Sequence, residues 1–271
     1  MGSVHILAVI FLAFNCATVI QARRVSCGYL PNGKRDDPLS FDGYLDKCQY
    51  PFFAHLESII DGHIHECDGV LLGNHYVLMT ASCLERQPDF GHYSVFFGLW
   101  DKEQKNDPNV QVRKIVGVIR HPQYSNVSFE HDLAVLELDH EVVYTSAVQP
   151  SLIFKDDRFM WRSYETVAVG YHSLDYAPSY RAHTEAPLMD QNVCKNRLTT
   201  LREHPDMNVC ATQHKDDTNG ILVTALYPAG MASGCAPLTD NESANTVVYA
   251  RLSKYCNWLH DATNNNWRCF Y

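Results

Sequence analysis

The chain has 271 residues, of which 46% are hydrophobic and 20% are charged, and its formal net charge at pH 7 is −9. A chain of this size can bury a full hydrophobic core, either as one large all-β domain or as two smaller units. The acidic balance argues against a general nucleic-acid binder, because the sequence has no Lys/Arg stripe that would neutralise phosphates; its longest basic cluster is Arg23-Arg24.

The first twenty-two residues have the pattern of a secretory signal peptide. Ile6 to Phe14 is a nine-residue apolar run, whereas a membrane-spanning helix needs about 18 apolar residues or more. Ala22 offers a small residue for cleavage before Arg23, although the segment before the apolar run lacks Lys and Arg. We therefore prefer a cleaved signal over a membrane anchor or a buried helix. No later segment is long and apolar enough to span a bilayer, so we expect a secreted, extracellular protein that does not contact a membrane.

Export determines how the ten cysteines are interpreted. Cys16 lies inside the predicted signal, and cysteines in an oxidising compartment mostly form disulfides. Nine cysteines remain in the mature chain: Cys27, Cys48, Cys67, Cys83, Cys194, Cys210, Cys235, Cys256 and Cys269. Because nine is odd, at least one thiol is free, capped or bonded to another chain. Two glycosylation sequons, at Asn126 and Asn241, fit the same compartment but carry less weight, because so short a motif also arises by chance.

Short apolar or alternating runs, separated by turn clusters, predict β-structure through most of the chain. These runs are Val70–Leu72, Tyr76–Met79, Tyr93–Leu99, Val110–Ile119, Leu133–Leu138 and Val167–Val169. Two stretches break the pattern and predict helices, Asp190–Arg197 and Ser253–His260. Many short strands at this spacing predict barrels or a sandwich.

Fifteen residues separate Cys67 from Cys83, and this segment ends in Met79-Thr80-Ala81-Ser82-Cys83. It resembles the histidine segment of trypsin-like serine proteases, which normally closes with Ala-Ala-His-Cys. Further stretches resemble that family in the same order along the chain. They are Gln49–Glu57, His121–Tyr124 with His131–Leu136, Val169–Tyr171, Asn192–Cys194 with Met207–Ala211, Ser233–Ala236, and Val248–Leu259.

The resemblance implies two antiparallel β-barrels with a cleft between them and a C-terminal helix. We expect a signal peptide over residues 1–22, a short N-terminal extension over 23–42 and a trypsin-like domain over 43–271. The family pattern also implies two disulfides, Cys67–Cys83 and Cys194–Cys210. The pairing of Cys27, Cys48, Cys235, Cys256 and Cys269 stays open. Cys256 and Cys269 can pair only if the Asn-rich segment between them turns back.

The resemblance also shows what the chain lacks. The mechanism of the family needs a nucleophilic serine, a histidine base and an aspartate that orients the histidine. Ser82 stands in the place of the histidine, and a hydroxyl cannot accept a proton near neutral pH as an imidazole does. Asp132 is retained in the place of the aspartate, and without a histidine to orient we expect it to have a structural, hydrogen-bonding role.

The nucleophile is expected between Cys210 and Cys235, in a loop of the pattern Cys-x-Gly-Asp-Ser-Gly-Gly-Pro. The family places roughly forty residues between these cysteines, whereas this chain has twenty-four, with no serine before Ser233. We therefore predict that the nucleophile loop is deleted. An alternative, in which Ser233 is a degraded nucleophile, leaves sixteen residues from Ser233 to Tyr249 for two strands and a pocket wall, so we assign Ser233 to a later turn.

Substrate-binding and activation features are altered as well. Pro228-Ala229-Gly230 stands opposite the substrate-pairing Ser-Trp-Gly of the family, and Val247 stands at a glycine that normally leaves a pocket open. The activation segment of the family corresponds to Leu39–Tyr44, which no Lys or Arg directly precedes. His63 and His65 alternate on a predicted strand and invite a metal site. Because Cys67 is assigned to a disulfide, we expect no metal and no cofactor.

These features predict a secreted serine protease homologue without catalytic activity. We expect it to act as a cofactor, scaffold or decoy in an extracellular proteolytic pathway. Its partners would be extracellular proteins, with active proteases or their substrates as candidates, and an odd cysteine would allow a disulfide-linked oligomer. The alternative is a structural or bulk component of saliva, venom, seminal fluid or matrix without a specific target. An active hydrolase is the least supported class.

Overall fold

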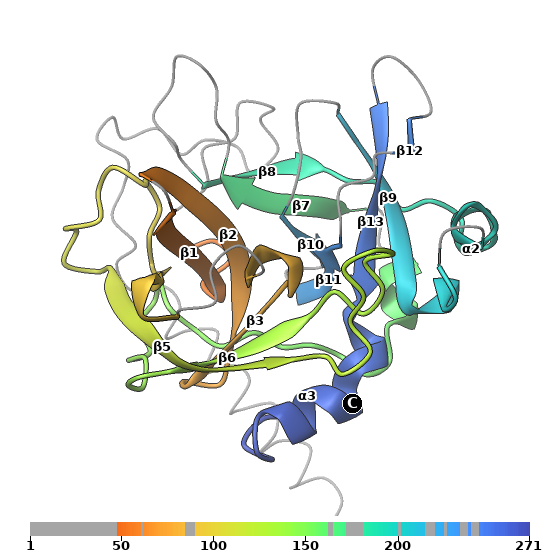
Figure 1. The fold of residues 1–271 in the computed structure, drawn as a ribbon. Helices are drawn as coiled ribbons and strands as arrows, with labels where there is room; N and C mark the ends of the chain where they lie inside the picture. Colours follow the sequence, from red (N-terminus) through yellow and green to blue (C-terminus); the bar gives the residue numbers. More distant parts are fainter. Residues whose placement is uncertain are drawn as a thin grey trace, which may run out of the picture.

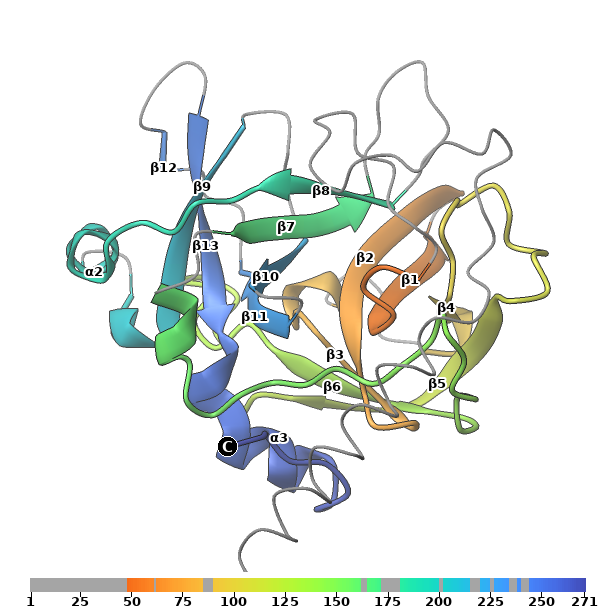
Figure 2. The ribbon, with the colours of Figure 1, turned by 180° about the vertical axis from the view of Figure 1, so that it is seen from behind.

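The computed structural model describes most of the predicted trypsin-like domain. The described residues are 48–60, 62–84, 90–161, 165–171, 181–199, 202–214, 220–224, 227–233, 238–239 and 244–271. The predicted signal peptide, the N-terminal extension, Cys27, Cys235 and Asn241 lie outside them. Two β-sheets lie side by side, the first formed by β1 to β6 and the second by β7 to β13 (Figures 1 and 2).

The first sheet is a closed antiparallel barrel in the order β1-β2-β3-β6-β5-β4. Alternate side chains of its strands point inward, and Leu56, Leu78 and Phe97 are fully buried there. A Cβ at Gly69 would lie 2.6 Å from the carbonyl oxygen of Leu78, so close strand packing requires glycine at this position. The strands are β1 (Phe53–Ile60), β2 (His63–Leu72), β3 (Tyr76–Met79), β4 (Ser94–Phe97), β5 (Gln111–Arg120) and β6 (Ala134–Leu138).

The second sheet has seven strands in the order β12-β13-β11-β10-β7-β8, with β9 paired to β13. The chain that follows β8 then runs beside β9: Leu188 bridges Ala211, and the N–H of Thr212 donates to the carbonyl of Pro187 at 3.0 Å. This pairing brings the sheet round on itself, so the predicted fold of two antiparallel barrels is confirmed. The strands are β7 (Thr166–Tyr171), β8 (Arg181–Glu185), β9 (Asn208–His214), β10 (Ile221–Thr224), β11 (Tyr227–Ala232), β12 (Leu238–Thr239) and β13 (Ala244–Arg251).

Two α-helices lie close to their predicted positions. The helix α2 (Gln191–Leu198) begins after Asp190, whose carboxylate accepts hydrogen bonds from the N–H groups of Asn192 and Val193, as an N-cap residue does. The helix α3 (Cys256–Ala262) continues a 3₁₀ turn, η5 (Leu252–Tyr255). The other 3₁₀ turns are η1 (Ser82–Leu84), η2 (Phe90–His92), η3 (Arg158–Trp161) and η4 (Pro205–Met207). Among the described residues, no helix is long and apolar enough to cross a membrane.

The C-terminal segment joins the two barrels. It leaves β13 of the second barrel, yet Leu259 and Ala262 of α3 are buried in the same core as the side chains of the first barrel. Asn266 donates a hydrogen bond of 3.4 Å to the Tyr76 hydroxyl at the start of β3. Figures 1 and 2 both show α3 below the barrels. A helix in contact with both halves restricts their relative motion.

The structure forms three disulfides within the described residues: Cys67–Cys83, Cys194–Cys210 and Cys256–Cys269. The first two are those that the family resemblance implied. The third forms because the chain reverses after α3 through Asn264 and Asn265, whose φ angles are 51° and 64°, a left-handed conformation that asparagine tolerates better than most residues.

Cys48 is also disulfide-bonded, so all seven described cysteines are in disulfides. Cys27 and Cys235 lie outside the described residues, so the thiol left over by the odd count stays a prediction.

Candidate functional site

Ser82 and Asp132 meet at one end of the first barrel. Met79 of β3 pairs with Ala134 of β6, so the residues that follow β3 and those that precede β6 lie at the same end of two adjacent antiparallel strands. The Ser82 N–H donates to Asp132 Oδ1 at 2.8 Å, and the Ser82 hydroxyl donates to Oδ2 at 2.7 Å. The Cys67–Cys83 disulfide fixes the neighbouring residue to β2.

The Asp132 carboxylate is fully buried, with 0% of its surface exposed. Burial raises the pKa of this carboxyl above its ordinary value, while hydrogen bonds from Ser82 and the Ala81 backbone oppose that rise. A buried carboxylate without such donors would carry a large desolvation cost. Asp132 therefore has the structural, hydrogen-bonded environment that we expected for it.

This pair cannot relay a proton. A catalytic imidazole donates one nitrogen-bound hydrogen to the aspartate and accepts the proton of the nucleophile at its other nitrogen. The single hydroxyl hydrogen of Ser82 is already donated to Asp132. Its remaining lone pairs are those of a neutral alcohol, which is not a base near neutral pH.

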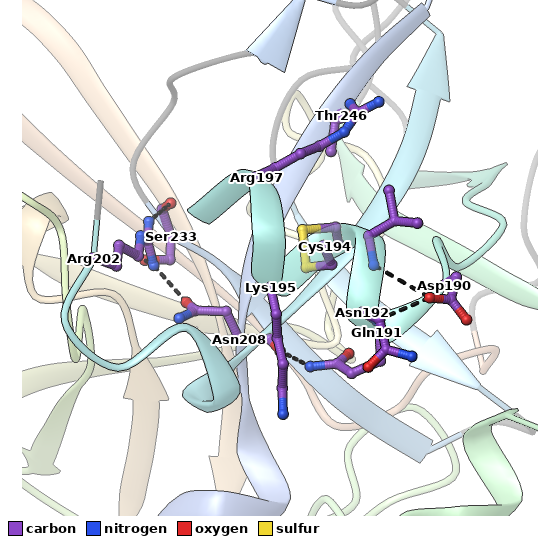
Figure 3. The surroundings of a disulfide bond; sticks show 12 residues. Asp190, Gln191, Asn192, Cys194, Lys195, Arg197, Arg202, Asn208, Ser233 and Thr246 are labelled. Atoms are coloured by element: carbon purple, nitrogen blue, oxygen red, sulfur yellow. Dashed lines mark hydrogen bonds between the residues drawn. A yellow bond between two sulfur atoms is a disulfide. The ribbon is translucent and has the colours of Figure 1, made fainter. Parts of the chain in front are cut away.

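A buried arginine of the second barrel interacts with the charge of this carboxylate. Arg202 donates through Nη1 to Asn208 Oδ1 and to the Ser233 hydroxyl at 3.3 Å, and through Nη2 to the Ser233 carbonyl at 3.1 Å (Figure 3). Burial lowers the pKa of Arg202, and the charge of Asp132 acts in the opposite direction. Arg202 thus supplies positive charge that acts on the buried Asp132 carboxylate.

Ser233 directly follows β11, and its hydroxyl is engaged. The hydroxyl donates to the Phe129 carbonyl of the first barrel at 2.9 Å, and the Ser233 N–H donates to the Val248 carbonyl at 2.9 Å. Only 1% of the residue is exposed. A hydroxyl that is buried and bonded to a backbone carbonyl, rather than to a base, does not have the surroundings of an activated nucleophile.

Pro228-Ala229-Gly230, which the sequence aligned with the substrate-pairing segment of the family, belongs to β11. This strand lies between β10 and β13, and Gly230 pairs with both Leu222 and Arg251. At Gly230 the strand is therefore paired on both sides. The sheet accommodates Pro228 because the β10–β11 register shifts between Leu222 and Val223, and a bulge tolerates a residue without an N–H.

The predicted loss of the nucleophile loop concerns a segment that is only partly described. Residues 215–219, which connect β9 to β10, lie outside the described residues, so the deletion stays a prediction. Gly220, at the start of β10, has a φ of 133°, and a Cβ there would lie 2.3 Å from the Val169 carbonyl oxygen. Only glycine fits at this position.

The position of Gly220 gives a second way to align this segment with the nucleophile motif of the family, which the spacing of the cysteines did not indicate. Placing Gly220 on the last glycine of Cys-x-Gly-Asp-Ser-Gly-Gly-Pro puts Asp217 on the aspartate and Thr218 on the serine. Two of the seven specified positions then match, and under this alignment the loop is substituted rather than deleted. Both alignments leave this segment without a serine nucleophile.

A second polar cluster, which the sequence did not predict, surrounds His55 on β1. The His55 ring is 1% exposed and contacts three carboxylates: Asp68 at 3.0 Å, Glu57 at 3.3 Å and Glu66 at 3.6 Å. Cross-strand pairing explains the cluster, because His55 pairs with Asp68 and Glu57 pairs with Glu66. Two lysines complete it, with Lys102 bonded to Glu66 and Lys105 to Glu57, each at 2.5 Å.

The charges in the His55 cluster balance when His55 is protonated. Burial alone would lower the pKa of His55, but the Asp68, Glu57 and Glu66 carboxylates, which accept from its ring nitrogens, outweigh burial and raise the pKa to about 10. The bond to His55 in turn lowers the pKa of Glu66 to about 2, with Lys102 adding to the effect. Three cations then face three carboxylates, which is the pairing that buried charges require.

Within the described part of the chain, two groups of side chains bring potential metal ligands together, one formed by His55, Glu57 and Glu66 and the other by His65, Cys67 and Cys83. In the first, the two lysines already bind the carboxylates. In the second, both sulfurs form the disulfide, and His65 lies 3.1 Å from the Cys83 carbonyl. Both groups are therefore accounted for by bonds within the protein.

The structure also places three further residues that the sequence analysis named. Asn126 is exposed, in the loop between β5 and β6, so an oligosaccharide could reach it. Val247 is half-buried in β13, where it pairs with Ala211 of β9. His63 is exposed on β2.

Comparisons with known proteins agree with the fold. The family model for Trypsin matches residues 46–259. Canine (Canis lupus familiaris) chymase is 24% identical over 227 residues, which cover 80% of this chain and 86% of chymase. Serine protease filzig of Drosophila melanogaster is 27% identical over 198 residues, 69% of this chain. The suppressor of tumorigenicity 14 protein homolog of Bos taurus is 29% identical over 110 residues, 39% of this chain.

The matches to the two longer relatives span only 10% of filzig and 13% of the bovine protein. A solved structure described as "Structure of GrC" superimposes with a TM-score of 0.67 at 19% identity and covers 81% of this chain and 97% of that one. At this identity the likeness shows the fold alone.

Removing the Ser82 hydroxyl should destabilise the protein. In Ser82→Ala the buried Asp132 carboxylate loses one of its donors, and a hydrogen bond to a charged group contributes about 1.5–3 kcal/mol. We expect the free energy of unfolding in urea to fall by about that amount. Ser94→Ala, which removes the hydroxyl of an exposed bond to Lys114, is the matched control and should change it by only a few tenths of a kcal/mol. Equal losses in both variants would contradict the role given to Ser82.

The protonated His55 ring should stabilise the folded protein, and this stabilisation should be lost at alkaline pH. Because its pKa is raised from 6.5 to about 10 in the folded state, its contribution is fully present below pH 6.5 and is lost as pH rises towards 10. The loss is on the order of a few kcal/mol. Urea unfolding between about pH 7 and pH 10 should show this decline in the wild type and a flatter profile in His55→Gln. His140→Gln alters a histidine whose side chain is 80% exposed and should keep the wild-type slope; an unchanged slope in His55→Gln would refute the assignment.

Proposed function

The chain belongs to the trypsin family of serine proteases, and from this premise we propose that it is a secreted, non-catalytic member that acts by binding other extracellular proteins. The observation that supports this most is the Ser82–Asp132 pair. The residue beside the family's aspartate carries a hydroxyl that donates to the carboxylate and offers no basic nitrogen. A serine hydrolase mechanism without a general base loses its proton transfer.

A second line of support comes from the surroundings of Asp132. Arg202, Ser233 and Phe129 are linked by hydrogen bonds across the junction of the barrels. These groups are satisfied by one another, so a peptide backbone would have to displace them. Binding through surface loops fits this arrangement better than binding along an extended strand. The three described disulfides support an oxidising, extracellular compartment.

Restoring the histidine alone should not restore hydrolysis. We expect Ser82→His to cleave a peptide library no faster than buffer, because no serine stands in the nucleophile segment to be deprotonated. Ser94→His serves as a control for the added imidazole. The double variant Ser82→His/Thr218→Ser tests the alignment based on Gly220: activity in this variant alone would show that the serine was substituted rather than deleted. Cleavage by the wild type that is lost in Asp132→Asn would overturn the proposal.

A binding role predicts saturable partners. Immobilised native chain, incubated with the fluid in which the protein occurs, should retain a small set of extracellular proteins, with proteases or their substrates among them. Chain that has been reduced and alkylated is the matched control, because it has the same composition without the fold. Non-reducing gels would reveal disulfide-linked complexes. If native and denatured chains retain the same proteins, the protein is better described as a bulk or structural component.

A further inference from the structure

Three histidines meet between the two barrels, next to Asp132. His121 follows β5 and stacks on His131, with ring centroids 4.6 Å apart and planes at 11°. The ring centroid of His131 lies 5.6 Å from that of His204, which precedes β9 of the second barrel. The hydroxyl of Tyr255 lies 3.3 Å from His131 Nδ1, and the ring of Trp258 lies 4.9 Å from that of His121. His121 is 9% exposed and His131 is 7% exposed.

Hydrogen bonds tie this group of rings across the barrels. Glu130 Oε1 accepts from the backbone N–H of His204 at 2.6 Å. The Ser233 hydroxyl donates to the Phe129 carbonyl at 2.9 Å. Segment 129–131 of the first barrel is thus held to the second barrel at the two residues that precede His131. We call the whole group the histidine junction: His121, Phe129, Glu130, His131, Arg202, His204, Ser233, Tyr255 and Trp258.

The geometry requires His121 to be neutral. The backbone N–H of Gln123 donates to His121 Nδ1 at 3.3 Å, so this nitrogen must present a lone pair. If Nδ1 were protonated, its N–H and the backbone N–H of Gln123 would be two donors that face each other. Burial, together with the charge of His131, also lowers the pKa of His121 to about 4.

The pKa of His131 is also lowered. Burial lowers its pKa, Glu130 acts in the opposite direction, and His204 and Arg202 lower it further. The other charged or titratable groups that face the junction are Asp132 from the first barrel, Asp206 from η4 and Tyr255 from η5. Burial raises the pKa of Tyr255, so this phenol stays neutral. Two stacked imidazolium rings would repel each other, and Arg202 adds to the repulsion at His131, whereas Glu130 acts against it.

We propose that the histidine junction is an acid-sensitive contact, which holds segment 129–131 to the second barrel at neutral pH and releases it when His121 and His131 become protonated. Release would remove the Glu130–His204 and Ser233–Phe129 bonds and expose the surroundings of Asp132. A surface that is closed at neutral pH would become available to a partner in an acidic compartment. The inference concerns the conformation of the junction and does not depend on whether the protein is catalytic.

The sign and size of the effect follow from linkage. A histidine with a lowered folded-state pKa stabilises the closed state above pH 6.5, and this contribution is lost as pH falls through 6.5 towards 4. If His121 regains an ordinary pKa of about 6.5 when the junction opens, the opening equilibrium rises about 30-fold between pH 8 and pH 5.

Amide hydrogen exchange in the full-length protein tests the proposal. After correction for the intrinsic pH dependence of exchange, protection of the His204 N–H should fall about 30-fold from pH 8 to pH 5. Protection of Leu78, in the middle of β3, should change much less. If both amides lose protection equally, the acid response is global unfolding and the proposal is wrong.

Two variants and a control complete the test. His131→Asn removes the titrating ring and tolerates the φ of 50° found at this position. His121→Gln keeps an acceptor for the Gln123 N–H. In either variant the loss of His204 protection between pH 8 and pH 5 should be reduced several-fold, whereas His140→Gln should behave as the wild type. An unchanged loss in both junction variants would overturn the proposal, and the comparison of His204 with Leu78 in the wild type decides it if neither variant folds.

Discussion

The fully buried Asp132 carboxylate is the constraint on which this end of the molecule depends. A charge in this position has to be compensated by donors, and the protein provides them from Ser82 and the Ala81 backbone. In the family mechanism the same carboxylate would hold a histidine. Here a shorter side chain, which begins the turn after β3, satisfies it directly. The substitution preserves the hydrogen bonding of the aspartate while removing the group that moves the proton.

Hydrogen bonds near Asp132 link the first barrel to the second. Arg202 bonds to Ser233, Ser233 bonds to Phe129, and Glu130 bonds to the backbone of His204. The barrels are also joined through α3, which packs into the core of the first barrel. The His55 cluster is a separate group of buried polar side chains. Tyr171 of the second barrel packs on its His55 ring. Its raised pKa and the lowered pKa of His121 give opposite pH responses, so stability should be greatest near neutral pH.

Local patterns predicted part of this structure well. Four strands of the first barrel, β3 to β6, alternate or run apolar and lie close to their predicted positions, and the Asp190 cap marks the start of α2. The second barrel was harder to predict because β11 contains Pro228 and Gly230, residues that ordinarily argue against an interior strand. Only the register shift opposite Pro228 explains how the sheet tolerates it. The Cys256–Cys269 bond likewise required the left-handed turn at Asn264 and Asn265, which composition suggests but does not establish.

The site was predictable at Ser82 because a disulfide-bounded motif fixes its alignment, and at Asp132 because the stretch His131–Leu136 resembles the aspartate segment of the family. The His55 cluster and the histidine junction were not, since their members come together through cross-strand pairing and through contacts between barrels. The central claim, that the protein has no activated nucleophile, is tested most directly by incubating the purified chain with a serine-directed phosphonate and measuring its intact mass. We predict no adduct under conditions that label an active member of the family completely. A stoichiometric adduct on a serine or threonine, abolished by Asp132→Asn, would contradict the claim.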